Sequence, residues 1–294
     1  MKKLGLILLI MVVSLVLSLN TTVASATDKQ NNDTALSEED MNSILKEKGY
    51  NESDINSASL DTKKKLVESG EKAEYEVEMV ETYTSLDGNT YEVTEENEDK
   101  INKLRQNDLD SMSVNQSKMF STSCVGLGCG FEGGKSDGTW SANTFVSKGR
   151  TLSNEYEYTF MTDFNWSSNV VANFTDTIAT AWERDFTAVA NTEGGYHYYI
   201  APYGMEVMPV PNLESDIYGL KAKFNIAGQK DAGGISQTLR VPKSSTGTTS
   251  SLVGAYAHPY SPVEIGFSIG PASITNKEFW GDKWTWRVNV TIGE

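Results

Sequence analysis

The stretch that decides the fold is Trp284-Thr285-Trp286-Arg287-Val288-Asn289-Val290-Thr291-Ile292. Its apolar and polar residues alternate strictly, which is the pattern of a β-strand with one face buried and the other in water. Tryptophan and valine also favour the pleated, half-buried surface of a sheet. We therefore predict a strand here. Its core-facing residues are expected to be Trp284, Trp286, Val288, Val290 and Ile292.

The same alternation recurs elsewhere between residues 118 and 294. Residues 155–160, 221–226 and 264–269 each place aromatic or aliphatic side chains at every second position. Clusters of Gly, Asn, Ser and Pro separate these segments, and no long helical pattern interrupts them. Short strands punctuated in this way are typical of an antiparallel sandwich or barrel. We predict that 118–294 is an aromatic-rich β-sandwich domain, which makes the protein mainly β.

Residues 27–117 differ in composition from the residues that follow. They hold 23 acidic and 10 basic side chains, and they lack Phe, Trp and Pro. Such a segment cannot supply the large apolar side chains of a sandwich core. We predict a small acidic α+β segment over 27–117, ahead of the β-sandwich, and a removable pro-region is one interpretation of it.

Local signals predict the elements of this acidic segment. Ser37 is a suitable N-cap for a helix that ends at Gly49. The Asp87-Gly88 pair lies between two alternating runs, which predicts a hairpin turn. Residues 95–107 are charged and helical in pattern, and 111–117 have the composition of a linker.

The first 26 residues have the pattern of an export signal. Lys2 and Lys3 precede an apolar run from Leu4 to Leu19, and Ala24-Ser25-Ala26 is a signal-peptidase site. The run is shorter than the roughly 20 residues that span a bilayer. We expect 1–26 to be a cleaved signal peptide and the protein to be secreted into the extracellular space.

Cys124 and Cys129 are the two cysteines of the chain. An even number of cysteines in an exported protein favours a disulfide. Four residues separate them, and two of these are glycine, so the loop can close without strain. We predict a Cys124–Cys129 disulfide that acts as a local clip.

The formal net charge of −15 restricts the partners. Nucleic-acid binding needs a basic surface, so we expect no nucleic-acid partner. We expect no cofactor and no metal, since no dedicated calcium-loop motif is present and a metal would need a third ligand beside the two histidines. Whether the acidic residues gather into a calcium site is left open by the sequence.

Two segments rich in tyrosine, glycine and proline contain both histidines of the chain. Tyrosine and proline present flat, rigid surface, which suits ligand-binding loops. If the two segments meet, they form a binding face; the alternative is that both histidines are hydrogen-bonded within aromatic packing. The predicted ligand-binding residues are Tyr196, His197, Tyr198, Tyr203, Tyr256, His258 and Tyr260.

These observations favour a non-catalytic extracellular module that binds a glycan, a peptide or a cell-surface polymer. One alternative is a secreted toxin or antimicrobial protein with an N-terminal pro-region, the only interpretation that involves membrane contact. A second is a carboxylate-type hydrolase, since glycoside hydrolysis needs only two carboxylates. The acidic residues that this hydrolase would draw on are Asp163, Asp176, Glu183 and Asp185.

Overall fold

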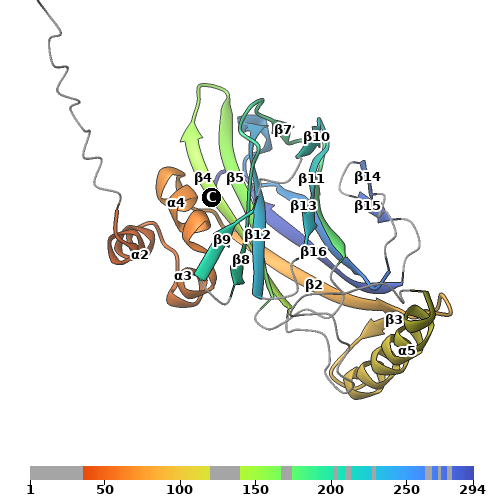
Figure 1. Cartoon of the computed structure of the whole chain (residues 1–294). Coiled ribbons are helices and arrows are strands. Elements are labelled where there is room, and N and C mark those ends of the chain that lie inside the picture. The colour runs from red at the N-terminus through yellow and green to blue at the C-terminus, as the bar shows by residue number, and fades with distance from the viewer. Residues whose placement is uncertain are drawn as a thin grey trace, which may run out of the picture. The chain divides into compact units, whose positions relative to one another are not determined.

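The computed structural model in Figure 1 describes most of the chain in segments. The chain divides into two compact units, residues 1–40 and 41–294, and only 36–40 of the first are described. The predicted signal peptide (1–26), Cys124, Cys129 and Tyr203 lie outside the described residues. The described segments are 36–119, 140–166, 174–201, 204–208, 213–226, 230–261, 267–270, 273–276 and 280–294.

Two antiparallel sheets form the second unit. Sheet one has the order β1-β4-β5-β12-β8-β9, with β7 also paired to β12. Its strands are β1 (Glu71–Lys72), β4 (Trp140–Thr151), β5 (Glu155–Trp166), β7 (Thr187–Ala188), β8 (Gly194–Ala201), β9 (Gly204–Val207) and β12 (Lys230–Pro242).

Sheet two has the order β10-β11-β6-β13-β16-β2-β3. A separate hairpin is formed by β14 (Phe267–Gly270) and β15 (Ser273–Asn276). The strands of sheet two are β2 (Tyr75–Thr84), β3 (Thr90–Val93), β6 (Thr175–Trp182), β10 (Glu214–Asp216), β11 (Gly219–Asn225), β13 (Thr249–Pro259) and β16 (Gly281–Thr291).

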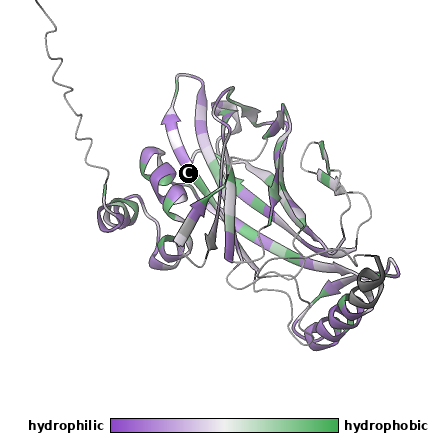
Figure 2. Cartoon of the chain, in the orientation of Figure 1, coloured by the Kyte–Doolittle hydropathy of each residue, from purple (hydrophilic) through white to green (hydrophobic). Residues whose placement is uncertain are grey.

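The two sheets enclose one apolar core, so the predicted antiparallel β-sandwich is confirmed. Val288, Val290 and Ile292 are fully buried, as the alternation of this segment predicts. Across the core, the Phe164 ring of sheet one lies edge-on to the Phe224 ring of sheet two, with centroids 4.9 Å apart. Alternating hydrophobic and hydrophilic residues are visible along the long strands in Figure 2.

Short helices cover the outer face of sheet one. Ile55 of α3 and Leu66 of α4 pack with Phe145 and Met161 of that face in a second apolar cluster, and Figure 1 shows α4 beside β4. None of the helices in the described ranges is long and apolar enough to cross a membrane. The helices are α2 (Glu38–Glu47), α3 (Glu52–Ser57), α4 (Leu60–Glu68), α5 (Glu98–Met119) and the 3-10 helix η1 (Lys243–Ser245).

Ser37 is the N-cap of α2, as predicted, because its hydroxyl accepts a hydrogen bond from the Asp40 amide at 3.2 Å. The turn at Asp87-Gly88 joins β2 to β3, as predicted. Residues 111–117, which we predicted to be a linker, are helical. These residues continue α5 to Met119, because the segment lacks glycine and proline, the residues that most often end helices.

The acidic segment contributes β1 to sheet one and both β2 and β3 to sheet two. Glu71 of β1 lies opposite Lys148 of β4 in sheet one. In sheet two, β2 pairs with β16 along its whole length. The change of composition near residue 117 therefore does not coincide with a boundary between sheets.

Candidate functional site

The predicted ligand-binding residues lie in two places. His197, Tyr256, His258 and Tyr260 are buried, with exposed fractions of 4% or less. Tyr196 and Tyr198 are half-buried. They alternate along β8 with His197, so they point to the outer face of sheet one.

His258 belongs to a hydrogen-bonded group in the core. Its Nδ1 lies 2.7 Å from Asp176 Oδ1, and both side chains are fully buried. The Tyr256 hydroxyl donates to the other oxygen of Asp176 and accepts from Trp166 Nε1 at 3.0 Å. Burial and the charge of Asp176 raise the pKa of Tyr256 well above its ordinary value, so the hydroxyl keeps the proton that it donates.

His197 and its partner aspartate form an equivalent pair within sheet one. His197 Nε2 lies 2.5 Å from Oδ1 of Asp231 on β12, and the histidine ring lies edge-on to Phe224 at 5.2 Å. The two histidines therefore enter one core from opposite sheets, and each is paired with an aspartate. No group of three metal-ligating side chains occurs within the described segments.

Tyr260 connects this core to α5. Its ring lies edge-on to His258 at 5.5 Å, and its hydroxyl donates to Asp282. Asp282 also accepts from Arg105 Nε of α5 at 2.9 Å. Arg105 Nη2 lies 2.5 Å from Glu81. Polar side chains thus run from the interior to the α5 end of sheet two.

Tyr196 and Tyr198 form an aromatic pair on the outer face of sheet one. Their rings stack with centroids 5.8 Å apart and an interplanar angle of 20°. Gly234 of the neighbouring β12 makes room for the pair. A Cβ at that position would lie 2.7 Å from the Tyr196 ring and 2.8 Å from Asp163 Oδ1, which is too close for any side chain.

Asp163 lies beside the tyrosine pair and is held by the start of α4. It accepts from Thr62 Oγ1 at 2.5 Å and from the Ser59 amide at 3.2 Å. Burial raises the pKa of this carboxyl above its ordinary value. The Tyr196 hydroxyl is buried beside Asp163 and Ser59 and interacts with both of their side chains. Burial and the neighbouring Asp163 carboxyl raise the pKa of Tyr196 well above its ordinary value, so the hydroxyl stays protonated.

The acidic residues considered for hydrolysis are dispersed. Asp163 lies on the outer face of sheet one, whereas Asp176 lies in the interior. Glu183 follows the far end of β6 and accepts from the Ser251 amide at 3.0 Å. Asp185 is exposed. A glycosidase needs its two carboxyls on either side of one bond, and these positions do not provide that arrangement.

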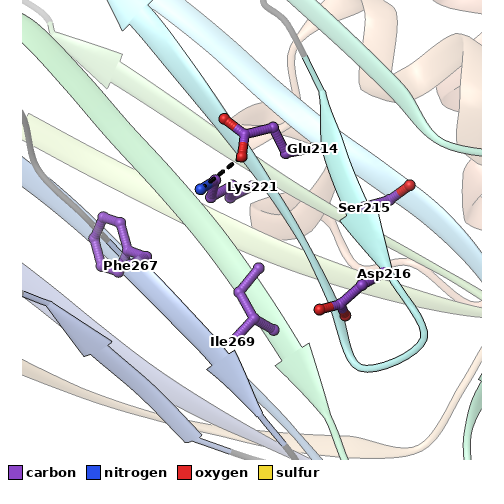
Figure 3. A pocket seen from close by; sticks show the side chains of 6 residues that line it. All are labelled: Glu214, Ser215, Asp216, Lys221, Phe267 and Ile269. Atoms are coloured by element: carbon purple, nitrogen blue, oxygen red, sulfur yellow. Dashed lines mark ion pairs between the residues drawn. The ribbon is translucent and has the colours of Figure 1, made fainter.

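A small hollow of about 170 Å³ lies over β10, β11 and β14. Lys221 Nζ pairs there with Glu214 at 2.7 Å, and Phe267 and Ile269 form the apolar side, as Figure 3 shows. Ligand pockets usually span roughly 300–1,000 Å³. The hollow is smaller than that, and none of the predicted site residues lines it.

The fold and the site define this protein as a two-sheet antiparallel β-sandwich with paired acidic and histidine side chains in its core. A scan against protein-family models and a search of curated proteins both find no match.

Similar solved structures include the collagen-binding subdomain of the Enterococcus faecalis surface protein ACE, with 11% identity and a TM-score of 0.27 over 46% of this chain and 87% of that one. The collagen-binding domain of a Staphylococcus aureus adhesin has 9% sequence identity and a TM-score of 0.26, over 47% of this chain and 94% of that one. The Streptococcus pneumoniae pilus backbone RrgB has 9% sequence identity and a TM-score of 0.30, over 52% of this chain and 50% of that one, so the match spans half of RrgB. These values are too low to transfer a role.

Sequence reasoning missed Asp231, Asp282 and Arg105 as members of the core network. Each lies in a segment whose local pattern is that of an ordinary strand or helix. One usable signal was present. Asp282 sits two residues before Trp284, on the face that alternation assigns to the core, and a buried carboxylate requires a partner.

Proposed function

We propose that this protein is a secreted, non-catalytic binding module, and that Tyr196 and Tyr198 contact its extracellular ligand. The observation that carries the proposal is the stacked pair itself. Two stacked rings lie partly exposed on the outer face of sheet one, near the exposed carboxyl of Asp61. Flat aromatic surface combined with a few polar groups is the usual composition of a small ligand site.

The charges near the pair restrict the ligand class. Asp61 and Asp163 both lie close enough to Tyr198 to raise its pKa, after the larger effect of burial. Carboxyl groups at this position disfavour an anionic polymer. Among a glycan, a peptide and a cell-surface polymer, the arrangement therefore favours a neutral glycan, whose hydroxyls can bond to the exposed Asp61 carboxyl while its ring lies on the tyrosines.

The burial of both histidines argues against their acting as catalytic bases. A general base must reach the proton that it removes. His197 and His258 are buried, and each already pairs with an aspartate. They hold the core together beneath the face that carries the tyrosine pair.

Retention on insoluble cell-wall glycan tests the proposal. We expect Tyr198→Ala to weaken retention about tenfold or more, because an aromatic anchor is lost. Tyr199→Ala is the matched control, since its hydroxyl bonds to exposed Glu206 on the opposite side of the strand. Equal retention of both variants and the native protein would reject this face.

Mass spectrometry of the secreted protein tests the remaining expectations. A mature chain beginning at Thr27 would support export with the acidic segment retained. A chain beginning near residue 118 would favour the pro-region alternative. That cleavage would break the covalent link between β1 and β2 and the strands with which they pair, β4 and β16.

A further inference from the structure

Part of β2 has no strand partner on its outer side among the described residues. The strand pairs with β16 from Tyr75 to Thr84. On its other side, β3 pairs only with residues 81–84. Among the described residues, 75–80 therefore have a strand neighbour on one side only. An unpaired strand edge presents backbone N–H and C=O groups that can pair with another chain.

The side chains of this open edge are apolar on one face. Val77 lies opposite Val288, and Met79 lies opposite Trp286, so both point to the core side of sheet two. Their β16 partners are buried, yet Val77 and Met79 are 43% and 45% exposed. Sheet one therefore covers Tyr75, which donates to Thr144 O of β4, but leaves Val77 and Met79 partly uncovered. Exposed apolar side chains along an open edge mark an interaction site or an aggregation hazard.

The other face of the same edge is acidic. Glu76 and Glu78 alternate with the apolar residues and are exposed, as is Glu74 just before the strand. A second copy of the chain pairing here would bring rows of glutamate together. Like charges opposite each other destabilise a sheet, so the charge pattern disfavours a homodimer and favours a basic partner.

We propose that residues 75–80 of β2 bind an extended cationic peptide segment by strand addition. The backbone of the incoming segment would pair with the open edge of the strand. Its apolar residues would cover Val77 and Met79, and its alternating lysine or arginine residues would face Glu76 and Glu78. Main-chain pairing supplies affinity in this mode of recognition, and the alternating side chains supply specificity. This site is distinct from the tyrosine face and does not depend on the glycan proposal.

Calorimetric titration of the full chain with a short peptide of alternating lysine and valine tests the proposal. We expect saturable binding, and no binding of the matching glutamate–valine peptide. Glu76→Lys/Glu78→Lys should weaken binding about tenfold or more. Glu95→Lys/Glu96→Lys changes the net charge equally at two exposed positions away from the edge, and it should bind like the native chain. Equal weakening by both double variants would show general charge attraction and overturn the proposal.

Hydrogen exchange provides a second measurement. The outward-facing amides of residues 75–80 should exchange quickly in the free protein and slowly after the peptide is added. Slow exchange in the free monomer would show that another part of the chain already covers the edge. Self-association that Glu76→Lys/Glu78→Lys alters would assign the edge to a second copy. Either result overturns the proposal, whereas Tyr198→Ala should leave peptide binding unchanged.

Discussion

His258 Nδ1 lies 2.7 Å from Asp176 Oδ1 at a place where neither side chain is exposed to solvent. The pair joins adjacent strands of sheet two, β13 and β6. The Tyr256 hydroxyl donates to the second carboxylate oxygen, so both oxygens of Asp176 have partners. A carboxylate satisfied in this way is stable in the core only while all of its partners remain.

Asp176→Asn should destabilise the protein by about 1–3 kcal/mol, because an amide cannot accept from both Tyr256 and His258 as the carboxylate does, and a buried partner is left unsatisfied. Urea unfolding followed by tryptophan fluorescence measures the change. Asp185→Asn is the control, since Asp185 is exposed, and it should stay within about 0.5 kcal/mol of the native protein. Similar unfolding midpoints for the two variants would contradict a structural role for the pair.

Tyr256→Phe should cost about 1–3 kcal/mol, since it removes one hydroxyl and leaves two buried partners unsatisfied. Those partners are the Asp176 carboxylate and Trp166 Nε1–H. The control Tyr199→Phe removes a hydroxyl bonded to the exposed residue Glu206, and its free energy of unfolding should barely change. The same urea experiment compares the two variants. Equal losses of unfolding free energy would contradict a stabilising role for the buried hydrogen bonds of the Tyr256 hydroxyl.

The strands and the first helix could be predicted because their signals are local. In β16 the alternation of five buried residues is itself the consequence of one face meeting the core. Ser37 and Asp40 likewise identify the start of α2 through contacts three residues apart. Such contacts are fixed by neighbouring residues, and the sequence shows them directly.

The site could not be predicted in the same way because it depends on the order of strands. His197 meets Asp231 only because β8 and β12 are neighbours in sheet one. Asp282 meets Arg105 across 177 residues. The pairing of β2 with β16 was equally invisible, and it places strands of the acidic segment inside the sandwich. No local pattern encodes which distant strands become neighbours.

Glu157→Gln should make stability less dependent on pH. Glu157 accepts from Arg150 at 2.8 Å and from Arg240 at 3.1 Å. Burial opposes its charge, but the two arginines outweigh that effect and lower the pKa of Glu157 below its ordinary value. The stabilisation is therefore present above the pKa of the unfolded chain, and it is lost as the pH falls through the lower pKa of the folded protein.

At neutral pH we expect Glu157→Gln to cost about 1 kcal/mol, since the exposure of Arg150 weakens the pair. The difference between the native protein and the variant should shrink as the pH falls below the pKa of the unfolded chain, and it should vanish once Glu157 is protonated in the folded protein as well. Urea unfolding at several pH values provides the comparison. Glu155→Gln is the control, at 4.0 Å from Arg240 and half-exposed. A difference from the native protein that does not change with pH would argue against this account.

Gly254→Ala should be among the most damaging single-methyl additions in the core. Gly254 of β13 lies opposite Trp286 of β16, and a Cβ there would lie 1.9 Å from the indole ring. The ring cannot move aside freely, because Trp286 is 98% buried against its neighbours. Overpacking of this kind costs about 3 kcal/mol. Gly270→Ala is the matched control, since its Cβ would meet only Ser273 Oγ at 3.4 Å. Thermal unfolding should show a clear loss for the first variant and little change for the second, and comparable melting temperatures would mean that the sheet accommodates the methyl group by shifting β13 away from β16.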